Sequence, residues 1–594
     1  MSIFDMKFFQ FLGFKKKPKA PWSKYYTKEQ MNLEIPDVSF YQVFHDNIAD
    51  HPNNIAISYF GTKITYLELD KMIEECYLSF LKSGIRKNDV VTICMPNTPE
   101  AVISVFALNK IGAIANMVHP LLSENEIKDS IISTGSVMLV LIDMDYQKVR
   151  DIIDETNVYR VIVIRPSDSM PKLMSMGYKL TQGRKTSLPK KNYKYVFWSD
   201  FIKESKFYVP RSNMERNGKN DPCVMLHSGG TTGTPKEIVL SNGNFIALGM
   251  QAKIVLPDLS SDDSFLSIMP VFHGFGLGAC VFVPLYLGSK AILLPRFDAK
   301  KFDKLLVKNR PSFVIGVPTL FEAMTKIPKK RSDKLNLGFL KYVITGGDKL
   351  KPKQDEEITK FLSDHGAHTR LIQGYGMSEC LGPICLEIKT NPTERSIGIP
   401  FPSCFMGIFD TNGNEVPYGE EGEICVSGPN LMLGYYNNEK ETNIALHIHK
   451  DGNIWLHSGD LGVMNKDGFI TYTGRIKRMI ISSGYNVYPI QIETLLESCE
   501  EVMICSVVGI PHDYKVEVPK AFIVLNSGYK KSDKLVKKFK ELCSKNLPKY
   551  AQPYEFEFRE SLPKTLIGKV DFRALQKENN EKREIDKQFL FFII

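Results

Sequence analysis

Hydroxyl and glycine residues are concentrated in one short stretch that ends in Pro-Lys and has an apolar run on each side. The stretch consists of Ser228, Gly229, Gly230, Thr231, Thr232, Gly233, Thr234, Pro235 and Lys236. Glycine lets the backbone approach an anion closely, and successive free N–H groups form a concavity that binds anions. Hydroxyls add donors, and Lys236 adds a positive charge suited to phosphate. The stretch predicts a phosphate-binding loop. A merely flexible linker, the alternative, explains neither the Pro-Lys ending nor the flanking apolar runs.

The spacing within this loop disfavours a common class of nucleotide-binding site. A Walker-type loop needs Gly, four residues and then Gly-Lys-Ser/Thr, whereas Thr234-Pro235 separates Gly233 from Lys236 here. The stretch instead resembles the phosphate loop of the adenylate-forming enzymes, which include acyl-CoA synthetases, adenylation domains of peptide synthetases and luciferases. The resemblance implies that the loop holds the β- and γ-phosphates of ATP, with Thr231 among the catalytic residues.

Three later motifs resemble the same family. His273, within Met269–Gly276, is implied to border the substrate carboxylate and gate the acyl pocket, although a lone histidine is more often structural. A second turn, implied to lie against the adenine, contains Gly346, Gly347 and Asp348. A third motif is implied to place Tyr375 on the adenine, Ser378 on phosphate and Glu379 on Mg²⁺; its nucleotide-contacting residues are Gly374, Tyr375, Gly376, Ser378 and Glu379.

The resemblance continues to the end of the chain. Asp460 is implied to accept hydrogen bonds from both ribose hydroxyls, and Arg475 to place a positive fork near the ribose or the α-phosphate. Lys477 stands at the implied hinge between two domains. Gly484 is implied to let the backbone approach the pantetheine arm of CoA. Lys569 falls on the catalytic lysine of the family's closing motif.

Short apolar runs alternate with helical patterns from about residue 37 onward. Residues 55–60 and 64–66 predict a hairpin, and 67–82 predict a helix that Gly84 can end. Buried strands are expected at 90–94, 137–142 and 161–164, and a capped helix is expected to begin at 97–100. The alternation predicts an α/β architecture. The resemblance adds a large N-terminal domain of parallel-rich sheets flanked by helices plus a distorted barrel, and a small mobile α+β C-terminal domain.

The expected organisation has four parts. An N-terminal tail spans 1–36, a large AMP-binding domain 37–476, a small C-terminal AMP-binding-associated domain 477–576, and a C-terminal tail 577–594. Residues 165–195 break the rhythm and are expected to form a surface excursion. In the small domain, Val516 stands where the family commonly has glycine, so that turn is expected to differ.

Composition limits which cellular compartment and which binding partners are expected. Hydrophobic residues make up 43% and charged residues 24% of the 594, which is ordinary for a soluble globular protein. Eleven scattered cysteines without a CxxC pair indicate reduced, mostly buried thiols. The net charge of +9 is modest, and no basic block is interleaved with aromatics, so nucleic-acid binding is not inferred. The expected location is cytoplasmic.

Three segments raise the question of membrane contact. Residues 265–288 lack charged side chains, but their prolines and glycines favour a buried strand, a turn and a core helix over a membrane span. The Phe-rich start with Lys15–Lys19 fits a peripheral anchor on anionic lipid. A segment packed on the body or a disordered end is weighed equally for it. The apolar end 589–594 poses the same question.

The combined motifs predict a stand-alone acid:CoA ligase. It would use ATP and Mg²⁺ to activate a small carboxylic acid as acyl-AMP and then transfer the acyl group to CoA. The apolar ends and closing motif favour a medium- or long-chain fatty acid, with aryl acids left open. An enzyme that loads a separate carrier protein, an oxidative luciferase and a catalytically silent nucleotide-binding relative are the alternatives. The sequence does not indicate an oligomeric state.

Overall fold

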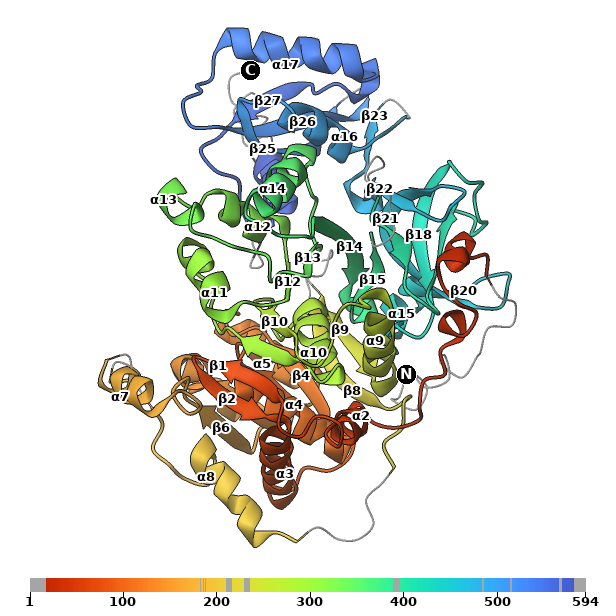
Figure 1. Cartoon of the computed structure of the whole chain (residues 1–594). Helices are drawn as coiled ribbons and strands as arrows, with labels where there is room; N and C mark the ends of the chain where they lie inside the picture. The colour runs from red at the N-terminus through yellow and green to blue at the C-terminus, as the bar shows by residue number, and fades with distance from the viewer. Residues whose placement is uncertain are drawn as a thin grey trace, which may run out of the picture. The chain divides into compact units, whose positions relative to one another are not determined.

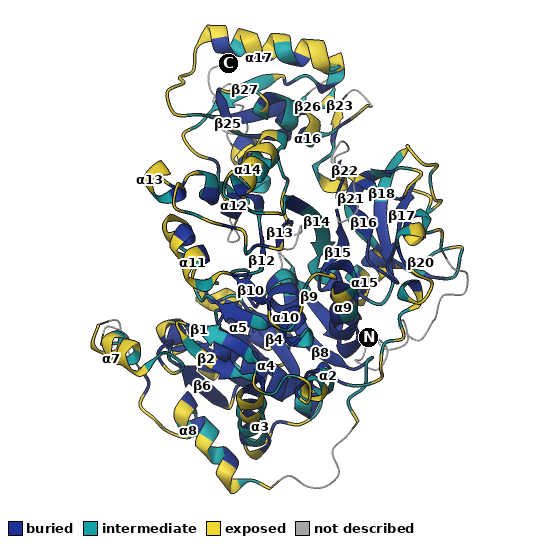
Figure 2. Ribbon diagram, viewed as in Figure 1, coloured by how far each residue is buried: buried dark blue, intermediate teal, exposed yellow. Residues whose placement is uncertain are grey.

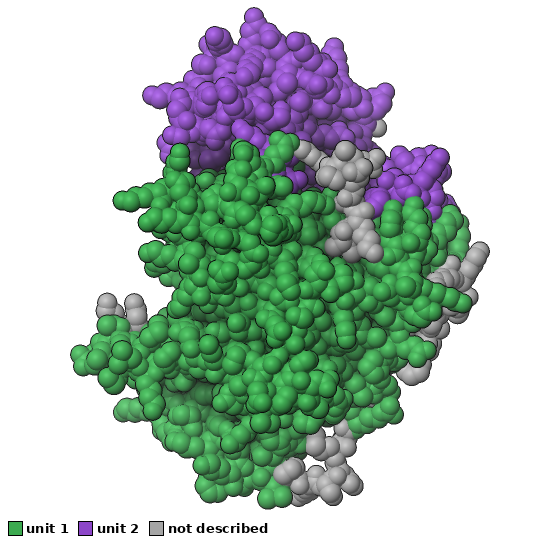
Figure 3. Space-filling view, viewed as in Figure 1, with its two compact units in different colours: residues 1–350, 356–406, 426–457 green, residues 351–355, 407–425, 458–594 purple. Residues whose placement is uncertain are grey.

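The chain forms two compact units, which Figure 3 draws in different colours. The structure is a computed structural model that describes residues 18–581, apart from 182, 185, 187, 210–215, 229–235, 388–395, 483–484, 513–514 and 566–568. The first unit comprises residues 1–350, 356–406 and 426–457. The second comprises residues 351–355, 407–425 and 458–594. Figure 1 labels the helices and strands of both.

An eight-stranded sheet of the first unit has the order β19-β9-β8-β4-β3-β5-β6-β7. Its strands are β3 (Val90–Cys94), β4 (Ile114–Val118), β5 (Met138–Ile142), β6 (Arg160–Ile164), β7 (Tyr195–Phe197), β8 (Pro222–Ser228), β9 (Lys236–Ser241) and β19 (Gly434–Tyr435). The strands from β8 to β7 are parallel neighbours, whereas β9 is antiparallel to both β8 and β19. Every residue of β3, β4, β5 and β6 is buried, as expected for parallel strands covered on both faces. The strands predicted from apolar runs are confirmed.

A nine-stranded sheet of the same unit has the order β16-β15-β14-β13-β12-β10-β11-β1-β2. Its strands are β1 (Ile55–Tyr59), β2 (Thr62–Thr65), β10 (Ser264–Ser267), β11 (Lys290–Leu293), β12 (Phe313–Gly316), β13 (Tyr342–Thr345), β14 (Leu371–Met377), β15 (Gly382–Leu386) and β16 (Ile399–Pro400). The pairs from β1 to β14 are parallel, and the pairs beyond them at both edges are antiparallel. The predicted β1–β2 hairpin is present.

The helices expected at 67–82 and from 97–100 onward are present, with capping residues at their ends. In α3 (Tyr66–Lys82), Thr65 and Glu68 form a capping box. In α4 (Pro99–Ile111), the Thr98 side chain accepts a hydrogen bond from the Ala101 N–H, and Gly112 ends the helix at φ +83°. All of α4 except Lys110 is buried (Figure 2). Local capping chemistry therefore fixes the ends of helices that the sheets then cover.

Two segments differ in how well the sequence predicts them. The charge-free stretch forms β10, a π-helix η6 (Phe275–Phe282) and α10 (Val283–Tyr286), which confirms the predicted strand and core helix. Within the described part of the chain, no helix is long and apolar enough to cross a bilayer. The excursion at 165–195 contains a helix that the sequence analysis missed, α7 (Lys172–Leu180). None of its residues is buried, so no core-facing pattern marked it (Figure 2).

The second unit contains a five-stranded sheet with helices α16 (Pro489–Glu497) and α17 (Asp533–Asn546). Its strands are β23 (Ile480–Ser482), β24 (Tyr485–Val487), β25 (Val502–His512), β26 (Val516–Leu525) and β27 (Glu555–Phe558). Val516 adopts φ +68°, so the backbone keeps a glycine-like conformation although the side chain is β-branched. Another sheet, which is not confined to the second unit, has the order β17-β18-β21-β20 with β22 beside β21. Its strands are β17 (Phe405–Phe409), β18 (Glu421–Ser427), β20 (Leu446–Ile448), β21 (Ile454–Met464) and β22 (Ile470–Arg475).

The cysteines are reduced and almost all buried, as the sequence predicts. All eleven are free thiols, and Cys499 alone among them is partly exposed. The α/β class, the large unit of parallel-rich sheets and the smaller C-terminal unit agree with the fold expected from the sequence.

Candidate active site

The strands β8 and β9 bring the two ends of the predicted phosphate loop together. Ser228 and Lys236 are paired across these antiparallel strands. The segment between them leaves the carboxyl end of β8, which lies parallel to β4 in the buried sheet. Ligands of α/β sheets bind at the carboxyl ends of strands. The remaining predicted loop residues lie outside the described residues: Gly229, Gly230, Thr231, Thr232, Gly233 and Thr234.

Lys236 is held at the base of this loop by two groups from the region around β19. Its ammonium forms an ion pair with Glu441 in the first turn of α15 (Glu439–Ala445). The same nitrogen lies 4.8 Å from the centroid of the Tyr435 ring. Tyr435 is in place because β19 pairs with β9, with Tyr435 opposite Ile238. The lysine is therefore oriented before any ligand arrives.

Glu379 reaches the same cluster from the other sheet. It belongs to η8 (Ser378–Cys380), which contacts both β8 and β9. The Tyr435 hydroxyl donates a hydrogen bond to Glu379 Oε1 at 3.0 Å, and the Met432 N–H donates to the Glu379 carbonyl at 2.8 Å. Burial and then the negative charge of Glu379 raise the pKa of Tyr435, so it stays a neutral donor. Ser378, Glu379 and Lys236 are thus gathered around the ends of the predicted loop.

The two predicted adenine turns lie at neighbouring strand ends. Gly346 and Gly347 follow β13, and Gly374 and Gly376 lie in β14, which pairs with β13 in parallel. A Cβ on Gly346 would lie 2.9 Å from the Gly374 carbonyl oxygen, so the two backbones approach closely. Gly347 has φ +74°. The backbone geometry requires glycine there, independently of any ligand.

The side chains at these turns differ in exposure. Asp348 is exposed, and its Oδ1 accepts a hydrogen bond from the Lys349 N–H at 2.8 Å. Tyr375, between the two glycines of β14, is partly exposed and pairs with Cys385 of β15. The structure therefore brings these predicted residues together around the ends of two neighbouring strands, β13 and β14.

His273 lies near a second histidine to which the sequence analysis assigned no role. His227, the residue before Ser228 in β8, has its pKa lowered to about 4 by burial and then by the charge of His273. Its Nε2 lies 2.7 Å from Asn116 Oδ1, so that nitrogen carries the hydrogen. Asn116 in turn donates to Thr92 Oγ1 at 3.0 Å. Neutral His227 thus belongs to a buried polar network at the carboxyl end of β8.

The second unit holds the remaining described candidates. Asp460 and Arg475 are opposite each other on β21 and β22, and Arg475 Nε lies 2.7 Å from Asp460 Oδ1. Asp460 is buried, whereas the Arg475 side chain is 52% exposed. Lys477 is exposed in η9 (Ile476–Arg478), between β22 and β23. Lys569 is partly buried, and its carbonyl accepts a hydrogen bond from the Thr565 N–H at 2.8 Å. Gly484 lies outside the described residues.

The sequence analysis missed three contributors to the first-unit cluster: His227, Tyr435 and Glu441. His227 had a signal, because a polar residue directly after the apolar run Val224–Leu226 needs a hydrogen-bond partner. Tyr435 and Glu441 had none, because the pairing of β19 with β9 joins segments about 200 residues apart.

Two family profiles and several known proteins resemble this chain. The family profile described as AMP-binding enzyme matches residues 44–436, and the one described as AMP-binding enzyme C-terminal domain matches residues 491–569. A long-chain-fatty-acid–CoA ligase of Bacillus subtilis (strain 168) is 30% identical over 581 residues, covering 96% of this chain and 99% of that protein. A feruloyl-CoA synthase of an Amycolatopsis species is 28% identical, covering 87% and 94%.

The fold is also found in solved structures. The crystal structure of the anthranilate CoA ligase AuaEII in complex with anthranoyl-AMP matches with a TM-score of 0.78 and 20% identity. The match covers 93% of this chain and 98% of that one.

Proposed function

The chain belongs to the AMP-binding enzyme family, and we propose that it is an acid:CoA ligase that activates a long-chain fatty acid. The name of the Bacillus subtilis relative supports the acyl class. Aryl acids are the second candidate, because a feruloyl-CoA synthase also resembles nearly the whole chain.

The proposed reaction has two steps. A carboxylate oxygen of the acid attacks the α-phosphorus of ATP, and the bond to pyrophosphate breaks. The CoA sulfur then attacks the acyl carbon, its proton passes to solvent, and AMP leaves. Protein side chains form no covalent bond in either step. Their work is to position the reactants and to stabilise charge at the phosphorus.

The cluster of Lys236, Tyr435 and Glu379 carries this proposal. It lies where Ser228 and Lys236 close the glycine-rich segment, at the carboxyl end of β8. Lys236 provides a fixed cation for the β- and γ-phosphates, and the segment 229–235 provides N–H groups and hydroxyls. Ser378 adds a hydroxyl from η8. Thr231 is placed among the catalytic residues of this loop.

The donor set at Glu379 fits Mg²⁺. A carboxylate oxygen is a ligand that Mg²⁺ prefers together with phosphate oxygens, and Tyr435 orients this carboxylate through its hydrogen bond. Glu379 would hold the ion, which would neutralise phosphate charge when bound.

Other residues take the roles that their positions support. The turns at Gly346–Asp348 and Gly374–Gly376 receive the adenine, with Tyr375 against its face. His273 borders the acyl carboxylate. Asp460 holds the ribose hydroxyls.

In the second unit, Arg475 stands beside Asp460 and adds a cation near the ribose. Lys569 neutralises charge during adenylation, and Gly484 lets the pantetheine arm approach during thioester formation. Lys477 is the proposed hinge between a large domain at 37–476 and a small one at 477–576. Its exposed position in a three-residue helix between two strands supports that role.

Pyrophosphate release with ATP and a panel of acids tests the proposal. We expect release with long-chain fatty acids, and acyl-CoA formation only when CoA is added. Release with ferulate or benzoate alone would favour the aryl candidate. Release without thioester would favour a carrier-protein acceptor. Nucleotide binding without any release would identify a silent relative and overturn the ligase proposal.

We also propose peripheral contact with anionic membranes. The N-terminal Phe- and Lys-rich segment lies mostly outside the described residues, but α7 supplies a second apolar surface. Leu173, Met176 and Leu180 are 83, 61 and 57% exposed and share one helix face because they are spaced i, i+3 and i+7. Lys172 and Lys179 are exposed on the same helix. Such a face suits a bilayer interface carrying negative charge.

Vesicle sedimentation tests this contact. Binding to phosphatidylglycerol vesicles at low salt should fall in the triple variant Leu173→Ser, Met176→Ser, Leu180→Ser, and on deletion of residues 1–19. The variant Val307→Ser, Ile444→Ser removes exposed apolar side chains elsewhere and should bind normally. If the unaltered protein ignores these vesicles, the contact does not exist.

A further inference from the structure

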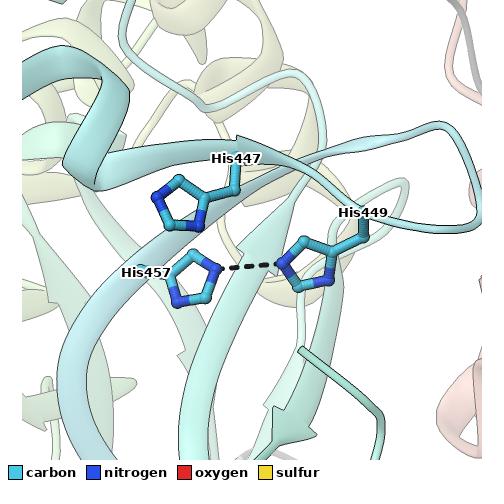
Figure 4. A group of neighbouring side chains, drawn as sticks. All are labelled: His447, His449 and His457. Atoms are coloured by element: carbon cyan, nitrogen blue, oxygen red, sulfur yellow. Dashed lines mark hydrogen bonds between the residues drawn. The ribbon is translucent and has the colours of Figure 1, made fainter. Parts of the chain in front are cut away.

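The β20–β21 hairpin, called the ribbon below, is an edge of its five-stranded sheet, lies on other residues than the proposed nucleotide cluster and carries three histidines on one face. β20 pairs antiparallel with β21, with His447 opposite Trp455, and the His449 N–H donates to the Asn453 carbonyl at 3.0 Å. Side chains alternate between the faces of a strand. His447 and His449 therefore share a face with Trp455 and with His457, two residues beyond it (Figure 4).

The imidazoles converge on one point. His449 Nε2 and His457 Nε2 are 2.9 Å apart, joined by the dashed line in Figure 4. Each of the three rings has a nitrogen within 4.8 Å of a nitrogen of the other two. The ring centroids of His447 and His457 are 4.3 Å apart. Three nitrogen ligands from one short ribbon thus lie within the reach of a single ion.

The surroundings hold the His449 ring in place. Trp455 stacks on it with a centroid distance of 5.7 Å and an interplanar angle of 25°. The Trp455 indole N–H donates to Asp451 Oδ2 at 3.1 Å, which ties the stacked ring to the turn of the ribbon. His447 is exposed and His457 half-buried, so the cluster is open to solvent on one side.

We propose that His447, His449 and His457 bind one divalent transition-metal ion of the Zn²⁺ type. Zinc–imidazole bonds of about 2.0–2.1 Å in a tetrahedral arrangement place ligand nitrogens roughly 3.3 Å apart, so side-chain rotations suffice. The hydrogen between His449 and His457 moves to the other nitrogen of its ring through solvent, leaving two lone pairs facing the ion. Water fills the fourth position. Imidazole suits Zn²⁺, Co²⁺ and Ni²⁺, whereas Mg²⁺ prefers oxygen.

Bound metal would cross-link the two strands of the ribbon. An ion that binds the folded chain and not the unfolded one raises the free energy of unfolding, and with it the unfolding temperature, by an amount that grows with the logarithm of its concentration relative to its dissociation constant. This site is independent of the proposed ligase reaction, because its ligands are nitrogens and it lies on other residues than Glu379.

The test uses the full chain without a histidine tag. Equilibrium dialysis with Zn²⁺ should give one tightly bound ion, and Co²⁺ should show the intense visible bands of a four-coordinate site. His447→Asn and His449→Asn should each weaken binding at least about tenfold, since even an outer partner of a ligand is worth 10–100-fold. His368→Asn removes an exposed histidine elsewhere and should bind normally.

Fold integrity is checked by the unfolding temperature in EDTA, which should be equal for the His449→Asn variant and the unaltered protein. Zn²⁺ should raise that temperature in the unaltered protein only. Equal Zn²⁺ binding by the His449→Asn and unaltered proteins, displacement of Zn²⁺ by equimolar Mg²⁺, or no bound ion would each overturn the proposal.

Discussion

The two units supply their proposed site residues by different means. In the first unit, Gly346 presents backbone directly after the buried strand β13, and Gly374 and Gly376 present it from the partly buried end of the neighbouring strand β14. In the second unit, Arg475, Lys477 and Lys569 present side chains from an antiparallel ladder and loops, and Arg475 is about half exposed. The positions of backbone groups are fixed by the fold itself. The side chains of the second unit project from the fold and can be changed without altering it.

We expect this difference to separate effects on nucleotide binding from effects on the rate of a chemical step. A change at a backbone-held position should disturb the fold and nucleotide binding together. A change at one of these side chains should alter a single chemical step and leave the fold intact. Two predictions test this separation, and two more compare the stability of the units; the largest expected effect comes first.

Replacing Lys569 should affect one step only. Lys569→Ala should slow acyl-adenylate formation by on the order of 10²–10³, which is the usual cost of removing one group that stabilises transition-state charge. Thioester formation from synthetic acyl-adenylate and CoA should stay near normal, as rapid-quench assays of each half-reaction would show. Lys564→Ala, an exposed residue that forms an isolated bridge with Val570 in the same segment, is the control. Equal slowing of both half-reactions would contradict the separation.

Gly376→Ala should damage both stability and ATP binding. A Cβ there would lie 1.8 Å from the Gly382 carbonyl oxygen of the paired strand β15, so the strands must move apart. Such overpacking typically costs about 1–3 kcal/mol. Gly177→Ala in α7 meets no atom within 4 Å and should be tolerated. Denaturant unfolding and ATP titration of both variants measure the effect; normal ATP affinity in Gly376→Ala would refute it.

Buried charges should make the two units respond oppositely to pH. Burial raises the pKa of Glu100 to about 7, against a hydrogen bond from Ser169 Oγ at 2.6 Å. In the second unit, burial also opposes ionisation of Glu557, but hydrogen bonds from Lys520 and Arg559 prevail and lower its pKa. Between about pH 4.5 and 7, folded Glu100 binds a proton that the unfolded chain has lost, so its contribution to stability falls as the pH rises. The contribution of Glu557 to stability is present above the ordinary pKa of a glutamate and is lost as the pH falls through the lowered pKa of Glu557 in the folded chain.

Calorimetry from about pH 2 to 8 can resolve these two contributions. Glu100→Gln should lessen the loss of stability between pH 5 and 8, and Glu557→Gln should lessen the loss in acid. An unchanged pH profile in Glu100→Gln would show that this carboxyl does not titrate as described.

Val516→Gly should give the smallest change, a small increase in the free energy of unfolding. The left-handed conformation costs a non-glycine residue roughly 1–2 kcal/mol, and glycine loses part of that through its greater freedom when unfolded, so a net gain of about 0.5–1 kcal/mol is expected. The side chain is 66% exposed and little packing is lost. Val518→Gly, at a buried position of the same strand, should instead destabilise the protein. Chemical denaturation compares the two.

Local chemistry explains what the sequence predicted. Thr98 and Pro99 started α4 as expected, and the apolar run at 90–94 gave β3 with the same bounds. Short-range capping and burial decide such elements. The position of Lys236 opposite Ser228 also follows from apolar runs on both sides of a loop.

Long-range pairing explains what the sequence did not reveal. Glu441 reaches Lys236 only because β19 joins β9, and no spacing pattern announces an ion pair between such distant residues. α7 was missed because an exposed helix has no core to impose a periodic burial pattern. Val516 adopts φ +68°, a conformation that favours glycine and that the sequence alone does not predict for a β-branched residue.

The buried free thiols can report local opening of the structure through the rates at which they react with a thiol-specific label. A thiol-specific label reaches an enclosed sulfur only when the surrounding structure opens, so its reaction rate reports that local opening. Cys499 is partly exposed, so it would react first, without opening of the structure. Cys94 in β3 and Cys543 in α17 are buried, and each would report on a different unit. Because the reporters are native, the order in which the units loosen can be read without introducing a single foreign residue.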